Sequence, residues 1–350
     1  MVYKKLKFLL INDKKRINQE FVRKDLELFS KVVEITKLKN IPDLSNFIRN
    51  ILRLPYLIKI ARKYDYIYGW WLYNYLATIV GFFAKKPVIL VSGGNDTAYM
   101  PEIKYGAFCN PILNLLVRIN LKLVYYIRFV DKHLKFQLET NGKTKVKRYS
   151  ILPTFFDSEF WVPNSKERKY ILSVSGNSFS NKQKFFTRFL VKGIDRFLKL
   201  ARMFPNEIFL LVGYKIDIFR KYIKNIPPNL NVIEKVSKED LLKLYQKTKI
   251  YCQFSRHEGF PNAICEAMLC GCMAISSKEK GILTATNNFG TIIDFKEKNA
   301  WFNLSKEFMR LLNSKEPINI KGRNYIIRNY DNQIGLVKSK KFIEKLIKSN

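Results

Sequence analysis

The residues best suited to chemistry lie in one short stretch, SRHEGFPNAICEAMLCG, at positions 255–271. Glu258 and Glu266 stand eight positions apart in this stretch. A carboxylate accepts hydrogen bonds from paired hydroxyls, such as those of a ribose or a hexose, and it would repel a phosphate placed directly against it. We therefore expect sugar hydroxyls to be the partners of both glutamates.

The elements around this stretch predict an anion site beside the two carboxylates. The apolar run at 250–254 is typical of a buried strand, and a helix is expected from Asn262, with Pro261 at its start and Gly271 at its end. The free N–H groups and the dipole of the first helical turn favour negative charge, and Gly259 lets the backbone approach a ligand closely. Phosphate is thus left to backbone amides and a lysine.

Strand-like runs alternate with helical patterns along the chain, which predicts parallel α/β structure. In the first half, strands are expected at 7–11, 31–38, 64–68 and 87–92, and helices at 43–64 and 73–84. Prolines and charges interrupt the pattern at 151–169, where we expect a linker. The predicted domains are a lobe at 1–160, a second lobe at 161–321, and a helical segment at 322–350 that packs back on the lobes.

The chain carries 63 Lys and Arg against 29 Asp and Glu, a net charge of +34 over 350 residues. The excess is +17 in residues 1–150 and +17 in residues 151–350, so it is spread along the chain. A nucleic-acid reader would show a basic stripe with a recognisable motif, and the sequence contains neither a zinc finger nor an RNA-recognition signature. Nucleic acid is therefore disfavoured, and an anionic bilayer or a polyphosphate-bearing substrate suits the charge better.

The five cysteines form no Cys-x-x-Cys pair and have no nearby histidine to complete a metal set, so no metal site is predicted. Reduced, buried thiols indicate a cytoplasmic protein. The N-terminal apolar run is too short for a secretion signal, and no uncharged span reaches 18 residues. We expect no membrane crossing.

The run from Glu258 to Gly271 resembles the Glu-x7-Glu signature of the family-four retaining glycosyltransferases. VKGID at 191–195 resembles the family's phosphate-contacting segment, and the loop SGGND at 92–96 resembles one on the acceptor side. The resemblance implies a GT-B fold, in which two Rossmann-like lobes turn their parallel sheets toward a central cleft. It places the acceptor on the first lobe and the donor on the second.

The resemblance also implies residue roles. Glu258 would act at the donor sugar, Glu266 would bind the ribose, and Lys192 would bind the phosphates. The donor would further contact the loop and helix start at Gly259, Phe260, Pro261 and Asn262. These roles imply transfer of a sugar from a nucleotide sugar with retention of configuration and without an obligatory metal. The acceptor would be a glycan or a lipid-linked glycan.

Two positions depart from the family pattern. The family's arginine before the lysine corresponds to Arg188, but the segment is long, and Lys182 and Lys184 compete for that place. Many members carry a histidine in the first lobe near the reacting sugar, whereas the corresponding loop here has none, and Asp96 takes the predicted catalytic place. Whether Asp96 or another residue is the N-terminal catalytic partner stays open.

Residues 110–127 are largely apolar, with Asn114, Arg118 and Lys122 at four-residue spacing. This pattern is compatible with a core helix and equally with a helix at a bilayer interface whose basic residues face lipid headgroups. The second alternative predicts peripheral contact with an anionic membrane, on its inner face. Two other functions stay open for the chain: a glycosyltransferase-like fold without transfer activity, and a basic protein that binds polyanions or nucleic acid.

Overall fold

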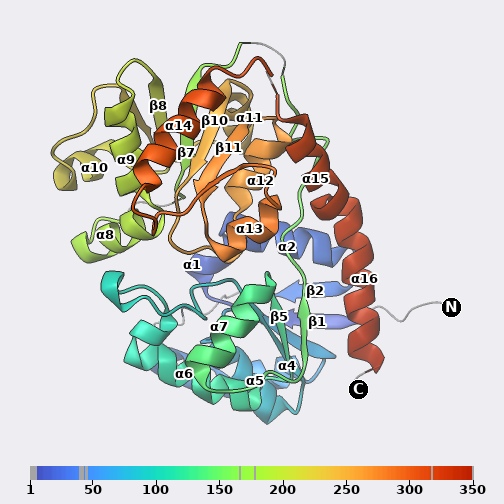
Figure 1. The fold of residues 1–350 in the computed structure, drawn as a ribbon. Helices are drawn as coiled ribbons and strands as arrows, with labels where there is room; N and C mark the ends of the chain where they lie inside the picture. Colours follow the sequence, from blue (N-terminus) through green and yellow to red (C-terminus); the bar gives the residue numbers. More distant parts are fainter. Residues whose placement is uncertain are drawn as a thin grey trace. The chain divides into compact units, whose positions relative to one another are not determined.

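The structure is a computed structural model that describes residues 6–38, 43, 46–164, 167–176, 179–316 and 318–348. The chain forms two compact units, drawn in Figure 1. Unit 1 comprises Met1–Phe155 together with Asn332–Asn350, and unit 2 comprises Phe156–Asp331. The division thus falls inside the predicted linker. The predicted third segment is split, because helix α15 (Ile320–Tyr330) belongs to unit 2 and helix α16 (Asn332–Lys348) to unit 1.

Unit 1 is built on a parallel sheet in the order β2-β1-β3-β4-β5-β6. Every neighbouring pair of strands is parallel, as the β-α alternation predicted. The strands are β1 (Lys7–Leu10), β2 (Glu34–Lys37), β3 (Tyr66–Trp70), β4 (Val88–Ser92), β5 (Tyr126–Phe129) and β6 (Tyr149–Ile151).

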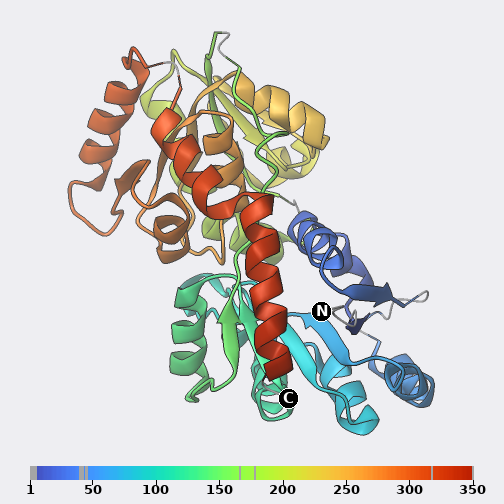
Figure 2. The ribbon, with the colours of Figure 1, turned by 90° about the vertical axis from the view of Figure 1, so that its right-hand side faces the viewer.

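Helices cover both faces of this sheet, as the continuous apolar strands require. On one face, α2 (Glu20–Ser30) packs with α16, and the rings of Phe29 and Phe342 lie 5.9 Å apart. Figure 2 shows α16 running along unit 1. On the other face lie α5 (Tyr75–Ala84) and its neighbours. The unit also contains α1 (Lys14–Ile17), α6 (Pro111–Leu123), α7 (Lys132–Gly142), the short 3-10 turns Pro101–Ile103 and Ala107–Cys109, and two helices between β2 and β3.

The single helix predicted at 43–64 is wrong. In the structure it is two helices, α3 (Phe47–Leu52) and α4 (Leu54–Ala61), which meet at Arg53. Pro55 lies in the first turn of α4, where its missing N–H costs nothing, whereas it would break a continuous helix. The apolar spacing continues through this proline, which is why periodicity alone predicted one helix.

Unit 2 is built on a second parallel sheet, in the order β12-β11-β10-β7-β8-β9. Its strands are β7 (Tyr170–Val174), β8 (Ile208–Val212), β9 (Leu230–Ile233), β10 (Thr248–Gln253), β11 (Met273–Ser277) and β12 (Thr291–Ile293). The helices besides α15 are α8 (Lys182–Val191), α9 (Ile194–Met203), α10 (Ile216–Tyr222), α11 (Lys238–Gln246), α12 (Asn262–Leu269), α13 (Lys280–Thr286) and α14 (Ala300–Leu312).

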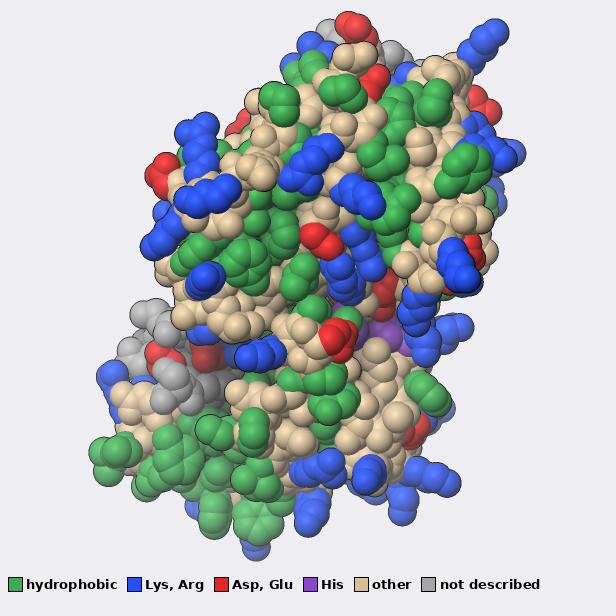
Figure 3. All heavy atoms as spheres, turned by 60° about the vertical axis from the view of Figure 1, so that its left-hand side comes forward, with side chains coloured by type: hydrophobic (Ala, Val, Ile, Leu, Met, Phe, Trp, Pro, Cys, Tyr) green, Lys and Arg blue, Asp and Glu red, His purple; other side chains and the backbone are tan. Residues whose placement is uncertain are grey.

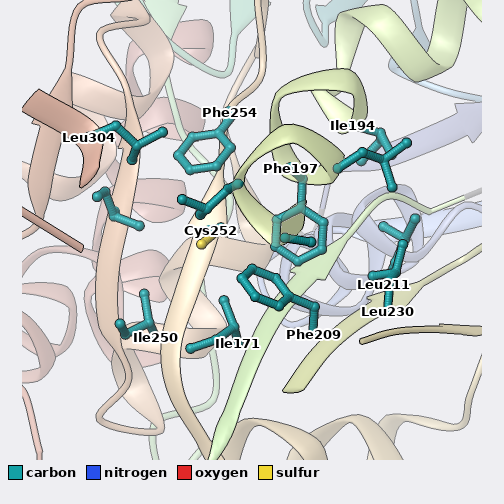
Figure 4. Packing of buried hydrophobic residues seen from close by; sticks show 14 of the residues in the cluster. Ile171, Ile194, Phe197, Phe209, Leu211, Leu230, Ile250, Cys252, Phe254 and Leu304 are labelled. Atoms are coloured by element: carbon teal, nitrogen blue, oxygen red, sulfur yellow. The ribbon is translucent and has the colours of Figure 1, made fainter. Parts of the chain in front are cut away.

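The core of unit 2 lies between strands of its sheet and the helices α8, α9, α10 and α14. Figure 4 shows Ile171, Phe209 and Ile250 of neighbouring strands in one cluster with residues of α9 and α14. Phe254, just beyond the end of β10, belongs to the same cluster. The core therefore fixes the point at which the chain leaves β10, and the loop that follows carries Glu258.

Candidate functional site

Glu258 lies in the loop between β10 and α12, and three donors converge on one of its oxygens. Oε1 accepts hydrogen bonds from Lys192 Nζ at 2.5 Å, Ser255 Oγ at 2.6 Å and Gln253 Nε2 at 2.9 Å. The side chain is buried. Within the described part of the chain no donor lies on Oε2, so this oxygen is the one that a ligand hydroxyl can reach.

A glycine brings Lys192 to this carboxylate. Gly193, between α8 and α9, has a φ of 65°, and a Cβ built on it would lie 2.0 Å from the carbonyl oxygen of Phe254. Only glycine combines this left-handed conformation with so close an approach. The turn between the two helices therefore packs directly against the end of β10 and sets Lys192 beside Glu258.

An ion pair ties the same loop to the start of α9. The guanidinium of Arg256 donates to both carboxylate oxygens of Asp195, at 2.8 and 2.6 Å, and the Arg256 amide donates to the Val191 carbonyl. On the other side, the Ser277 hydroxyl donates to the carbonyl of Ser255. Sequence reasoning missed Arg256, because its partner lies 61 positions away and nothing in the local pattern indicates the pair.

The charges around Glu258 explain its protonation state. Burial raises the pKa of Glu258, but the Lys192 ammonium, the Ser255 hydroxyl and Arg188 together outweigh burial, and the pKa lies below its usual value. Burial lowers the pKa of Lys192, and the Glu258 carboxylate opposes that effect. Arg188 also acts on both groups, while Lys182 and Lys184 lie exposed on the first turn of α8. Of Lys182, Lys184 and Arg188, it is therefore Arg188 that lies near Lys192 and Glu258. Arg188 also donates to the Ser175 carbonyl.

The first turn of α12 follows Glu258 directly, and its backbone donors are not capped by a side chain. Pro261 is the N-cap residue and makes no capping hydrogen bond. The side-chain oxygen of Asn262 is buried and has no hydrogen-bond partner among the described residues. Gly281 of α13 lies against the backbone of the loop, since a Cβ there would be 2.8 Å from the Glu258 carbonyl and 2.9 Å from that of Gly259. The arrangement can bind an anion.

Glu266 lies in the second turn of α12 and is buried, which excludes the solvent-facing helix acid that most glutamates are. The hydroxyl of Tyr245 donates to its Oε2 at 3.4 Å. Tyr245 is itself buried, so this carboxylate lies on the inner side of the helix. A carboxylate held in this way presents acceptor oxygens to hydroxyls.

Phe260, predicted to contact the donor, packs into an aromatic cluster of unit 2. Its ring lies 5.1 Å from that of Tyr330 and 6.4 Å from that of Phe156. The contact with α15 anchors the middle of the loop, while Glu258 and Asn262 stand at either side of the anchor. Direct donor contact by Phe260 stays a prediction.

Asp96, the predicted catalytic residue of unit 1, follows β4 and is fully buried. Its Oδ1 accepts from the Ser92 hydroxyl at 3.1 Å and the Gly94 amide at 2.9 Å, and its Oδ2 accepts from the Leu72 amide at 3.0 Å. Burial raises the pKa of Asp96, and the backbone donors oppose it. These bonds hold the loop in shape, and the catalytic role stays a prediction.

A pair of buried side chains, Asp131 and His133, lies at the same carboxyl edge of the sheet of unit 1 as Asp96. Asp131, at the end of the neighbouring strand β5, caps α7 and approaches His133 Nδ1 at 2.7 Å. Both side chains are buried. Because β4 and β5 are adjacent parallel strands, this pair and the Asp96 loop belong to one edge.

The fold of this chain is similar to that of several solved structures. The structure matches the crystal structure of Anabaena HepE in complex with UDP and glucose (TM-score 0.74, 13% identity, 99% of this chain and 100% of that one). It likewise matches sucrose-phosphate synthase from Thermosynechococcus elongatus (0.73, 13%, 99% and 100%) and a glycosyltransferase from Rickettsia africae (0.72, 14%, 99% and 100%). The fold is that of the GT-B glycosyltransferases.

Part of the sequence is similar to a known family. Residues 185–332 match the model of the glycosyl transferases group 1 family. The matched part covers most of unit 2 and includes Lys192, Glu258 and Glu266. No curated protein matches the sequence at a significant level. Among the helices that the structure describes, none has the length and hydropathy needed to span a bilayer.

Proposed function

We propose that the protein transfers a sugar from a nucleotide-sugar donor to an acceptor, with the donor bound by unit 2. The observation that carries this proposal is the grouping of Glu258, Lys192 and Glu266 around the uncapped N-terminus of α12. Cationic and backbone donors lie beside two buried carboxylates, which suits a molecule that combines a diphosphate with sugar hydroxyls.

Each part of the donor has a partner in this proposal. The first-turn amides of α12, together with Lys192 and Arg188, bind the diphosphate and stabilise the charge that develops on it as it leaves. Glu266 binds the ribose hydroxyls. Glu258 accepts from a hydroxyl of the transferred sugar through Oε2, while Oε1 stays bound to its three protein donors.

The finer features of the reaction are proposals too. Because positive groups and a helix end would face the leaving diphosphate, we propose that no metal is obligatory. We propose retention of configuration on the resemblance of the run from Glu258 to Gly271 to the Glu-x7-Glu signature. The acceptor, a glycan or lipid-linked glycan, would bind unit 1 near Asp96, and the Asp131–His133 pair at that edge is a second candidate for the catalytic partner. The five cysteines, all in the described part of the chain, form no disulfide, which supports a place of action in the cytoplasm.

The comparisons support the donor class. The part of the chain that matches the group 1 family covers the proposed donor site, and the HepE structures that this chain resembles contain UDP, UDP with glucose, or UDP-glucose. We therefore place uridine nucleotide sugars first among the donors to test.

A thermal-stabilisation screen against a panel of nucleotide sugars tests the proposal. A ligand present at about 100 times its dissociation constant stabilises the folded protein by about 2.7 kcal/mol. We expect at least one nucleotide sugar to raise the melting temperature and heparin or RNA not to do so. Stabilisation by the polyanions alone would contradict the proposal and favour a polyanion-binding protein. A nucleotide sugar could also bind while none of the acceptors tried causes release of its nucleoside diphosphate. That result would favour a fold without transfer activity.

A further inference from the structure

Helix α3 of unit 1 exposes the residues that a helix of a globular protein normally buries. Phe47, Ile48, Ile51 and Leu52 all face solvent, and the buried residue of the helix is Asn50. The Asn50 amide donates to the Asp43 carbonyl and to the Tyr75 hydroxyl, at 2.9 and 3.0 Å. The Phe47 ring, although more than half exposed, also lies 5.6 Å from that of Tyr75. The helix is thus attached through Asn50 and Phe47, while Ile48, Ile51 and Leu52 face outward, against the usual amphipathic arrangement.

The neighbouring helices expose further apolar residues. α3 packs on α4, α4 on α5, and α5 on α6. Phe82 and Phe83 at the end of α5 are both exposed and touch each other edge to face. On α6, Ile112, Leu115 and Ile119 are exposed at the spacing of one helical face. We call the exposed apolar residues of these four helices the α3–α6 face; Figure 3 shows hydrophobic side chains gathered at the lower left of the view, on unit 1.

The charges among these helices are all of one sign. Segments 46–64, 74–86 and 110–123 carry nine Lys and Arg and no Asp or Glu. Arg49, Lys59, Lys85 and Lys122 are among those exposed to solvent. Arg118 donates to the carbonyls of Asn141 and Gly142, which differs from the headgroup contact that the bilayer alternative gives it. The outward face of α6 is therefore the apolar row that ends at Lys122.

We propose that the α3–α6 face docks unit 1 on the surface of an anionic lipid bilayer. Large exposed apolar patches mark interaction surfaces, and helices that lie in the bilayer interface combine inserted apolar residues with basic residues at the headgroups. Anionic headgroups complement the basic residues of these segments. The proposal does not depend on the transfer reaction proposed above.

A second copy of this chain fits the face less well. A two-fold interface brings the same patch from each subunit together, so the basic residues of one copy would face those of the other. Each chain also carries a net charge of +34, which opposes self-association further. A bilayer rich in anionic lipid instead supplies the missing negative charge.

Co-sedimentation with vesicles tests the proposal, using phosphatidylcholine alone and phosphatidylcholine mixed with phosphatidylglycerol. The test variant is Ile48→Glu/Leu52→Glu, at side chains 75% and 76% exposed on α3. The matched control is Phe302→Glu/Met309→Glu, at side chains 70% and 51% exposed on α14 of unit 2, with the same change in charge. Since all four side chains face solvent, both variants should fold, and circular dichroism checks this.

We expect the wild type and the control to pellet with the anionic vesicles, and the test variant to show a partition coefficient lower by at least about tenfold. The same loss in Ile112→Glu/Ile119→Glu would support the extension of the face over α6. Failure of the wild type to pellet overturns the proposal, and so does equal binding of all variants or equal loss in test and control. Sedimentation velocity could instead show that the wild type is a dimer, that it does not bind vesicles, and that the α3 variant is a monomer. In that case the face is an interface between copies and the proposal is wrong.

Discussion

Replacing Lys192 by Met should destabilise unit 2 and make its stability depend on pH in a new way. The substitution keeps most of the side-chain volume but leaves Glu258 buried without its cation. The two side chains are 16% and 9% exposed. Removing one partner of a buried ion pair costs about 3 to 5 kcal/mol, and we expect about 3 kcal/mol because Ser255 and Gln253 still donate to the carboxylate. For a unit of this size that corresponds to a fall in melting temperature of about 6 to 12 °C.

The pH dependence has opposite signs in wild type and variant. In the wild type the pKa of Glu258 is depressed, so its stabilising contribution is present at neutral pH and is lost as the pH falls through that pKa. Without Lys192, burial is unopposed by the ammonium and raises the pKa of Glu258 above its unfolded value. The variant then loses stability as the pH rises. The gap between the two proteins should be widest at neutral pH and should narrow toward acid.

Differential scanning calorimetry at neutral and mildly acidic pH measures this gap, and the double variant Lys192→Met/Glu258→Gln is the control. With both charges removed, no uncompensated charge stays buried, so the double variant should recover at least half of the lost stability. Nucleotide-sugar binding should stay weak in both. A melting temperature of Lys192→Met within about 1 °C of the wild type at neutral pH would refute the reasoning. A double variant as unstable as the single one would refute it as well.

Two further substitutions test how the loop and the helix start are built. Gly193→Ala should lower the melting temperature and weaken donor binding, because its Cβ would lie 2.0 Å from the Phe254 carbonyl oxygen at a φ of 65°. The control Gly142→Ala, whose Cβ would have its nearest contact at 3.4 Å, should do neither. Thermal melts of the two variants test the prediction. Asn262→Pro removes the first N–H of α12 at a position where proline fits, whereas Asn262→Ala keeps it. Titration with a nucleoside diphosphate should show weaker binding in the proline variant than in the alanine one, and equal affinities would speak against an anion at this helix start.

The sequence allowed much of the fold and the centre of the site to be predicted, for physical reasons. Apolar runs and helical spacing are local, so the parallel sheets and the start of α12 at Asn262 could be predicted from neighbouring residues. The family resemblance assigned both Lys192 and Glu258 to the donor, and the structure brings the two side chains into contact. Their roles toward the donor stay predictions. The pair of Arg256 and Asp195 could not be foreseen, because it depends on the approach of two segments that are far apart in the chain.

The errors follow from the same distinction. Apolar periodicity does not say which side of a helix meets the sheet, so the outward orientation of Ile48 and Leu52 on α3 could not be predicted. The break before α4 depends on Pro55, which the spacing pattern does not register. Asp96 was assigned the catalytic place because its loop resembles one on the acceptor side and has no histidine. In the structure both of its oxygens accept from the loop, and its catalytic role stays a prediction.

Donor binding at α12 is the central claim, and titration calorimetry of Glu266→Ala tests it most directly. The matched control is Glu307→Ala, which removes a glutamate of unit 2 that pairs with Arg310 on the surface of α14. With the nucleotide sugar that stabilises the wild type most, we expect affinity to fall at least about tenfold in Glu266→Ala, since a hydrogen bond to a charged group contributes about 1.5 to 3 kcal/mol. Glu307→Ala should bind like the wild type. Unchanged affinity in Glu266→Ala would contradict the account.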